Sequence, residues 1–398
     1  MLFKDVIGQE ELKRQLIEMV EHNRLSHALL FLGKEGSGAL SLALAFAQYI
    51  ICQPPAAVEA VDLFGGVSKM ETGSSFIKPD EIHLQPAYQR ATQLIHPDLH
   101  FSFPVVAKKT GDKPLSSDFM AEWRNFVKTY PYGNVYDWLQ SIHADNKQGN
   151  ITAEECNDIM RQLSLKSFES EYKVLLLWMP EYLGKEGNKL LKLIEEPPAK
   201  TIFILVAENE EQILPTILSR CQQIKIPLLT NSEIANALVK NASANEEKAM
   251  QIASMAAGNY REALQLLHHA EEDWHSYIND WLKICLRRML PDQIKWTDEI
   301  NKLGREKQKQ LLRYFNHLLE QSIRIKILGV DNLPMPEIEK DFAARINKIT
   351  SVSQLQAIVE ELDKAMYYIE RNANGKMLFQ ALTIKMFHII QHKVVMGV

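Results

Sequence analysis

The sequence is poor in cysteine, in long apolar runs and in net charge. Its four cysteines are scattered and none forms a Cys-x-x-Cys pair, so we expect reduced thiols, no disulfide framework and no bound metal. No apolar run approaches the roughly 18 residues that a membrane span requires, and the amino terminus lacks the pattern of a signal peptide. These absences favour a cytoplasmic protein without membrane contact.

An excess of positive charge is also missing. The 398 residues include 45 Lys plus Arg and 50 Asp plus Glu, which gives a formal net charge of −5. A protein that binds nucleic acid alone needs clustered positive charge to neutralise phosphates, so any contact with DNA would be local or shared with partners. The length and the apolar fraction of 46% indicate a globular protein of two or three domains.

Short apolar runs alternate with amphipathic segments through the first 228 residues. The runs with the length and composition of strands cover 28–32, 99–106, 174–178, 201–207 and 223–228. The predicted helices cover 10–22, 39–51, 116–130 and 152–165. Thr152 and Glu155 form the Thr-x-x-Glu pattern of a capping box at the start of the last helix. Strands that alternate with helices predict an α/β fold with a parallel sheet.

Three domains are predicted. Residues 1–228 form the α/β domain, with an insertion at about 53–150 that opens with glycine, proline and serine around few apolar anchors. Residues 229–274 hold two or three short helices and form a small helical domain. Residues 275–398 repeat apolar positions at helical spacing, which predicts a third, all-helical domain.

A glycine-rich loop, GKEGSGAL, lies where the first strand meets a helix, a setting in which backbone amides and the helix dipole can hold phosphates. The phosphate-binding pattern GxxxxGK[ST] needs a lysine for the terminal phosphates and a hydroxyl for Mg²⁺. Those two positions are Ala39 and Leu40, although the glycines Gly33, Gly36 and Gly38 remain. A turn that only joins strand to helix is therefore favoured over nucleotide binding, and no cofactor is expected.

The carboxylate that nucleotide hydrolases use for Mg²⁺ and water is missing as well. It should follow the strand at 174–178, where the sequence has Trp178 and Met179. An active ATPase would have to use Lys34 in the loop and Glu181 beyond Pro180. A single carboxylate on a turn is more often a surface group or a helix-start residue. We therefore expect no ATP hydrolysis by the chain alone.

Four stretches occur in an order shared with one protein family: DVIGQ at 5–9, HALLF at 27–31, NKLLKLIEEPP at 188–198 and LSRC at 218–221. Together they resemble the clamp-loader branch of the AAA+ family and, within it, the delta-prime subunits of bacterial DNA polymerase III. The run LLKxxEEPP followed by Ser-Arg-Cys is the specific part of this resemblance, because the glycine loop alone would be a weak signal.

The resemblance implies an inactive ATPase subunit in a five-membered ring. It also implies that the arginine of Ser-Arg-Cys, here Arg220, projects into the ATP site of a neighbouring subunit as an arginine finger, with Ser219 and Cys221 as flanking packing and turn residues. A guanidinium can hold the γ-phosphate through two hydrogen bonds and stabilise charge in the transition state. The alternative is an arginine that caps a helix end or pairs with a local carboxylate.

Arg261, in Gly-x-x-Arg at the start of a helix, matches a position where active family members contact their own nucleotide. With an incomplete site it is either a residual phosphate sensor or a structural ion pair. Two departures from the family are clear. Of the four-cysteine zinc module that many relatives carry after the glycine-loop helix, only Cys52 remains, and Ala207 and Glu208 stand where active relatives have a polar sensing residue.

The function implied by the resemblance is that of a non-catalytic clamp-loader subunit. Its expected partners are the ATPase subunit, which binds ATP, and the clamp-opening subunit, with the sliding clamp and primed DNA reached through the complex. Two alternatives stay open. The chain could be an active AAA+ ATPase motor with an atypical nucleotide site, or an AAA+-fold interaction protein outside replication.

Overall fold

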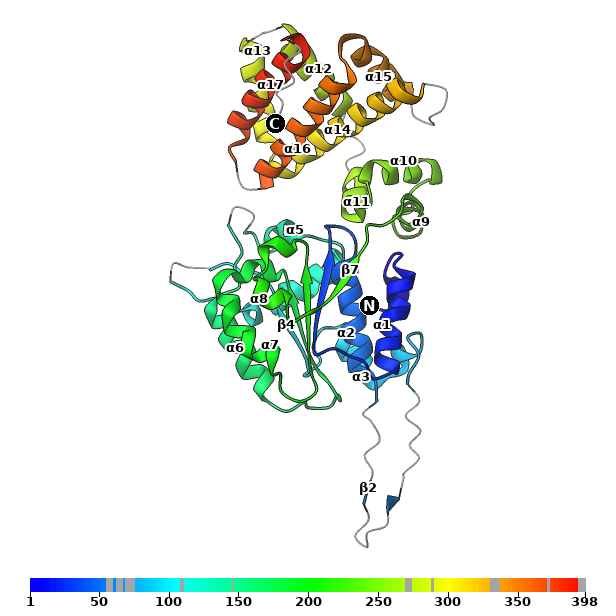
Figure 1. Cartoon of the computed structure of the whole chain (residues 1–398), viewed down its shortest axis with the longest axis vertical. Helices are drawn as coiled ribbons and strands as arrows, with labels where there is room; N and C mark the ends of the chain where they lie inside the picture. The colour runs from blue at the N-terminus through cyan, green and yellow to red at the C-terminus, as the bar shows by residue number, and fades with distance from the viewer. Residues whose placement is uncertain are drawn as a thin grey trace. The chain divides into compact units, whose positions relative to one another are not determined.

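The computed structural model describes the chain except for residues 55–59, 62–66, 69–75, 108–110, 145–146, 269–273, 288–289, 330–336, 371–372 and 393–398. Two compact units are present, Met1–His268 and His269–Val398 (Figure 1). Parts of the predicted insertion, residues 55–59, 62–66, 69–75, 108–110 and 145–146, lie outside the described residues. The domain boundary predicted near 229 falls inside the first unit, so the small helical domain belongs to the same compact body as the sheet.

A five-stranded sheet forms the centre of the first unit. Its strands are β1 (Ala28–Gly33), β4 (Leu99–Ser102), β5 (Lys173–Trp178), β6 (Thr201–Ala207) and β7 (Gln222–Ile226). They lie in the order β4-β5-β6-β1-β7, and every pairing is parallel. In register, Leu30 of β1 faces Leu205 of β6 and Gln223 of β7. The predicted α/β parallel-sheet fold is confirmed.

Helices cover both faces of this sheet. Those of the α/β part are α1 (Glu10–Glu21), α2 (Ala39–Ile51), α3 (Pro86–Thr92), α4 (Met120–Thr129), α5 (Val135–Ser141), α6 (Ala153–Ser164), α7 (Leu191–Glu195) and α8 (Pro215–Leu218). Short 3₁₀ turns are η1 (Phe3–Asp5), η2 (Ile82–Leu84), η3 (Ser116–Phe119), η4 (Pro180–Leu190) and η5 (Glu210–Gln212). Helices α1 to α3 lie on one side of the sheet and α6 to α8 on the other (Figure 1).

Burial on both faces explains why the strands are continuously apolar. Leu29 and Phe31 of β1 pack into one core with α2, whereas Ala28 and Leu30 pack into the other with α6 and α8. Every residue of α2 is buried, which accounts for its nearly all-apolar sequence. The first core also holds stacked Phe103 and Trp123, 4.2 Å between ring centroids.

Two sequence predictions need correction. The insertion was predicted to reach residue 150, but β4 pairs with β5 inside the central sheet, so the chain has rejoined the fold by Leu99. Thr152 does cap α6 by accepting from the Glu155 N–H, but the Glu155 side chain does not complete a capping box. Its Oε2 instead accepts from the Ser116 N–H at 2.8 Å, because the side chain is buried beside η3. Two strands of two residues each, β2 (Ala60–Val61) and β3 (Val67–Ser68), also pair antiparallel within the predicted insertion.

Three helices complete the first unit: α9 (Asn231–Ala242), α10 (Glu246–Ala256) and α11 (Tyr260–His268). They share a core of their own that includes Ile234, Leu238, Ile252 and Tyr260. Thr230 opens α9 with a true capping box, since its hydroxyl accepts from the Glu233 N–H while the Glu233 carboxylate accepts from the Thr230 N–H. We call α9 to α11 the lid.

The second unit is all-helical, as the sequence predicted. Its helices are α12 (Trp274–Arg287), α13 (Leu290–Lys302), α14 (Arg305–Leu328), α15 (Glu337–Ile349), α16 (Val352–Glu370) and α17 (Gly375–His392). They enclose a separate core around Trp281, which stacks on Trp296 at 4.8 Å and donates a hydrogen bond to the Thr383 hydroxyl. No described helix of the chain is long and apolar enough to cross a membrane.

Candidate functional site

The glycine loop follows β1 and leads into α2 at the carboxyl edge of the sheet. Gly36 and Gly38 have φ of 72° and 89°, the left-handed region that favours glycine. A Cβ on Gly36 would lie 1.8 Å from the Asn259 amide oxygen, and one on Gly38 would lie 2.8 Å from the Tyr132 ring. Both glycines are therefore required by close packing within the chain, whether or not a phosphate binds.

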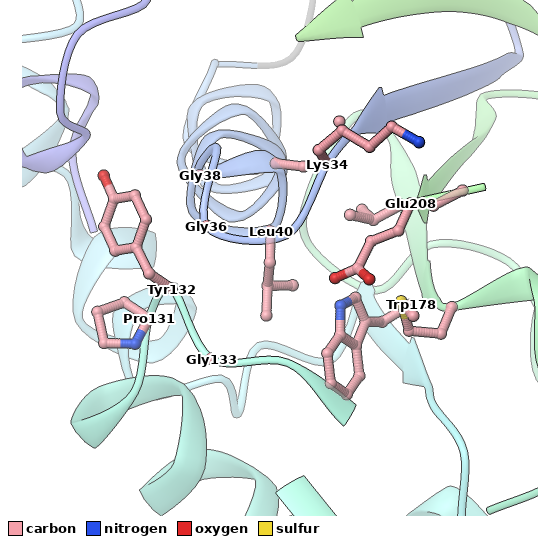
Figure 2. Close-up of a pocket in the computed structure, with 14 residues that line it drawn as sticks. Lys34, Gly36, Gly38, Leu40, Pro131, Tyr132, Gly133, Trp178 and Glu208 are labelled. Carbon is pink, nitrogen blue, oxygen red and sulfur yellow. The ribbon is translucent and has the colours of Figure 1, made fainter. Parts of the chain in front are cut away.

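The space at this loop is nearly filled. A cavity of about 20 Å³ remains, lined by the loop, by residues 131–133 and by the ends of β5 and β6. That is room for about one water molecule, whereas pockets for drug-sized ligands measure roughly 300 to 1,000 Å³. Leu40, Trp178 and Lys34 all line this space, and the Lys34 ammonium points away from the other two side chains (Figure 2).

Trp178 occupies the strand end where a hydrolase would carry its acid. Only 2% of the residue is exposed, because its indole packs against Trp123 and Phe126 at centroid distances of 5.1 and 5.7 Å. These rings belong to the first core, so Trp178 extends the hydrophobic core up to the glycine loop. A charged phosphate placed against the indole would lose part of its hydration to an apolar surface.

Glu181 does not reach the glycine loop and is not among the residues that line the cavity. Its Oε1 accepts hydrogen bonds from the backbone N–H groups of Glu208 and Asn209 at 2.7 and 2.9 Å. Burial raises the pKa of Glu181 above its usual value, against the backbone hydrogen bonds that lower it. The carboxyl group thus fixes the turn after β6 and is held away from the position that a catalytic acid would need.

Arg261 lies in the first turn of α11 and forms the centre of a buried ion cluster. Its Nε and Nη2 contact the two oxygens of Asp137, the second at 2.6 Å, and its Nη1 donates to Glu35 in the glycine loop at 3.0 Å. The arginine side chain is 5% exposed. The residue proposed from the sequence as either a phosphate sensor or a structural pair therefore bridges the lid, the glycine loop and α5.

The same contact is reinforced around Glu35. Asn259 and Asn134 donate side-chain hydrogen bonds to its two carboxylate oxygens at 3.2 and 3.1 Å, and the Tyr260 N–H donates to the Gly36 carbonyl at 3.2 Å. Hydrogen bonds to an ionised carboxylate are stronger than those between neutral groups. The lid is consequently joined to the glycine loop by residues of the chain itself.

Arg220 lies one turn beyond the start of α8, two residues before β7. Its guanidinium contacts Glu195 at the end of α7 through Nε and Nη2, and its Nη1 donates to the Thr216 carbonyl at 2.7 Å and the Ser219 hydroxyl at 3.1 Å. One third of the side chain is exposed. The local-carboxylate pairing that the sequence left open is thus present, and the side chain remains accessible.

The residues that flank Arg220 have structural surroundings. Ser219 donates its hydroxyl to the Thr216 carbonyl, and burial raises the pKa of the Cys221 thiol to about 11. A thiol with so high a pKa is poorly ionised at neutral pH and is unsuited to metal binding or nucleophilic chemistry. In the described part of the chain, no group of three or more His, Cys, Asp or Glu side chains is arranged to hold a metal ion.

The sequence indicated the loop and the two arginines but missed several of their partners. Glu195 belongs to the quoted LLKLIEEPP run, and its pairing could have been suspected from its charge. Tyr132 and Asp137 fall in the stretch predicted as an insertion, where no short-range pattern reveals that the chain returns to the glycine loop. The contact between Asn259 and Gly36 likewise joins residues far apart in the sequence.

Comparison with known proteins places the chain in a family. Residues 8–230 match the family described as DNA polymerase III, delta subunit, which is more than half of the chain. The chain is 23% identical to DNA polymerase III subunit tau of Bacillus subtilis, covering 96% of the chain and 61% of that protein. It is 26% identical to subunit delta' of the same organism, covering 66% of the chain and 60% of that protein.

Two further similarities have lower coverage or lower identity. Subunit tau/gamma of Haemophilus influenzae is 24% identical over 67% of the chain and 30% of its own length. A gamma subunit-related protein from Thermotoga maritima, solved as a crystal structure, aligns with 95% of the chain and 98% of its own, at 15% identity and a TM-score of 0.39. The chain spans about 60% or less of the length of these curated relatives. It belongs to the DNA polymerase III delta subunit family and so to the clamp-loader proteins.

Proposed function

We propose that this chain is a delta-prime-type subunit of a bacterial clamp loader, which binds no ATP of its own and acts through contacts with its partners. The observation that carries the proposal is the filled nucleotide space, in which Leu40 and Trp178 leave a cavity of about 20 Å³. These apolar side chains also stand beside a loop that lacks the lysine and the hydroxyl that would hold a triphosphate and Mg²⁺. The relatives named tau, gamma and delta' support the clamp-loader assignment but not the choice among subunits.

In this proposal Arg220 supplies the finger. The ATPase subunit binds ATP, the clamp-opening subunit and the ring hold the sliding clamp, and the Arg220 guanidinium reaches the γ-phosphate bound by a neighbour. Arginine fingers contribute roughly 10³ to 10⁵ in rate in well-studied nucleotide hydrolases. The partial exposure of Arg220 supports this role, because a fully buried arginine could not enter a neighbouring site.

An active ATPase that uses Lys34 and Glu181 receives no support from the geometry. Glu181 is engaged by the backbone of residues 208 and 209, and the Lys34 ammonium points away from Leu40 and Trp178 (Figure 2). The other alternative is an interaction protein outside replication. Association of the chain with clamp-loader subunits would support the proposal, and its absence would support this alternative.

The test measures ATP binding and hydrolysis by the chain alone, then DNA-stimulated hydrolysis after the other clamp-loader subunits are added. We expect no binding by the chain alone, and a fall in turnover of the complex of at least several-fold with Arg220→Ala. Arg14→Ala is the matched control, because Arg14 is also a partly exposed arginine paired with a carboxylate, Glu11. ATP turnover by the chain alone, or unchanged turnover with Arg220→Ala, would contradict the proposal.

A further inference from the structure

The three nitrogens of the Arg220 guanidinium are divided between two kinds of partner. Nη1 faces the chain's own α8, where it donates to the Thr216 carbonyl and the Ser219 hydroxyl. Nε and Nη2 form the opposite edge, and both contact the same oxygen of Glu195. The first set of contacts fixes the direction of the guanidinium, and the second occupies its outer edge.

That outer edge is the one a phosphate would use. Arginine binds carboxylates and phosphates through pairs of parallel N–H groups, so the two kinds of anion compete for the same donors. Glu195 therefore stands where an oxygen of a neighbour's γ-phosphate would have to arrive. Arg220 cannot act on that phosphate through Nε and Nη2 until the carboxylate has moved aside.

The position of Glu195 is fixed by the fold. The preceding residue, Ile194, and Ile217 of α8 are each 1% exposed and belong to the same core. The chain after Glu195 turns at Pro197 and Pro198, which end the helix. The end of α7, which carries Glu195, and the turn after α8, which carries Arg220, are thus held near each other by packing.

The position of Glu195 at a helix C-terminus is unfavourable for a negative charge. Glu195 is the last residue of α7, where the helix macrodipole disfavours a negative charge. Arg220 offsets that charge. The Arg220 side chain is 33% exposed and the Glu195 side chain 43%, so solvent screens this ion pair and makes it weak. Exchange of the carboxylate for a phosphate therefore requires little energy.

We infer that Glu195 is a positioning residue that covers the phosphate-binding edge of Arg220 and is displaced when the arginine engages a neighbour's triphosphate. The inference rests on the finger role proposed above. In the free chain Glu195 keeps the guanidinium extended and neutralised. In the assembled complex it competes with the phosphate and so restrains hydrolysis until the neighbour's site closes.

The experiment uses the full chain reconstituted with the other clamp-loader subunits, and measures ATP hydrolysis without the sliding clamp and DNA. The variants are Glu195→Gln, Arg220→Ala and the double variant, with Glu196→Gln as the control because Glu196 is an adjacent exposed carboxylate and the charge change is identical. We expect Glu195→Gln to raise turnover about two- to five-fold, in line with the strength of exposed ion pairs. The increase should appear in kcat, with little change in KM.

The double variant shows whether the effect passes through Arg220. If it does, Glu195→Gln has no effect when Arg220 is absent, and the double variant behaves like Arg220→Ala. An increase that persists in the double variant overturns the inference, as does unchanged or lowered turnover with Glu195→Gln alone. If Arg220→Ala itself leaves turnover unchanged, the finger role fails, which is a separate result. Should Glu195→Gln impair assembly, Glu195→Asp shortens the carboxylate while keeping its charge, and the same comparisons apply.

Discussion

Glu181 is a buried carboxyl group whose two oxygens have different surroundings. Two backbone N–H groups satisfy Oε1, while Oε2 is buried without a hydrogen-bond partner among the described residues. Burial raises the pKa of Glu181, so the folded chain holds the proton more tightly than the unfolded chain. A raised pKa of an acid contributes stability that is present at low pH and is lost as pH rises through the folded-state pKa.

We therefore expect Glu181→Gln to stabilise the protein at neutral and alkaline pH. Glutamine keeps an oxygen for the two N–H groups of residues 208 and 209 and removes the buried negative charge. The midpoint of thermal unfolding should be higher for the variant than for the wild type at pH 8, and the difference should shrink as the pH falls towards 5. A difference that is absent at pH 8, or that grows on acidification, would show that the Glu181 carboxylate is stabilised as an anion.

Arg261 holds the lid against the glycine loop and α5. It joins the lid to the glycine loop and to α5 through Glu35 and Asp137, with its side chain 5% exposed. Removal of one partner from a buried ion pair typically costs about 3 to 5 kcal/mol, since uncompensated charges remain. Here two carboxylates would be left beside each other.

Arg261→Met should consequently lower the free energy of unfolding by about 3 to 5 kcal/mol and loosen the lid. Amide hydrogen exchange should accelerate first in α9 to α11, while β1, β5 and β6 keep their protection. Lys248→Met is the control, because Lys248 is an exposed cation on the same lid. Unchanged lid exchange in Arg261→Met would mean that the lid is held by its apolar contacts alone.

The loop between α6 and β5 presents apolar side chains on a fixed backbone. Asp98, 1% exposed, accepts from the N–H groups of Phe168, Glu169 and Ser170, the last two at 2.8 Å. Arg90 pairs with Glu169 on the same loop. Phe168 and Leu165 are nevertheless 81% and 67% exposed. An exposed aromatic side chain on a backbone held in this way, Phe168, is suited to contact with another protein, since little ordering entropy is lost on binding.

Phe168→Ser should leave the thermal stability of the chain unchanged and weaken its binding to one of the proposed partners, by about tenfold for loss of a buried aromatic contact. Affinities for the sliding clamp and for each loader subunit would be measured by surface plasmon resonance. Leu84→Ser, at a separate residue that is 70% exposed, is the control. If Phe168→Ser binds every partner with the same affinity as the wild type, this loop is not a contact surface.

At the scale of elements, the sequence predicted the strands and most helices because their apolar runs are bounded by glycine and proline. It predicted a strand at 99–106 but could not predict that residues 131–137 return to the glycine loop. Tyr132 and Asp137 meet Gly38 and Arg261 only in three dimensions, and neither contact leaves a periodic pattern. The absence of the lysine and the hydroxyl from the glycine loop could be recognised in the sequence. The ion cluster of Arg261, Glu35 and Asp137 that holds the lid could not.

The whole molecule consists of two units with separate cores. The clusters that hold the sheet and the lid lie within residues 1–268, and the cluster around Trp281 lies within 274–390. No hydrophobic core cluster formed by the described residues draws side chains from both units. Each unit also has the size of an ordinary independent domain. The two units should therefore fold separately.

We expect fragments 1–268 and 269–398 each to unfold cooperatively, and the circular dichroism spectrum of the whole chain to equal the weighted sum of the two. If the second unit is the oligomerisation domain, as the family resemblance implies, fragment 1–268 should fold yet fail to assemble with the other clamp-loader subunits, while fragment 269–398 should compete with the whole chain for assembly. The measurement is size-exclusion chromatography of each fragment with the partner subunits. Stable assembly of fragment 1–268 would instead place the main contacts on the sheet and lid, and a fragment 1–268 that is unfolded alone would show that its three cores depend on the helical unit.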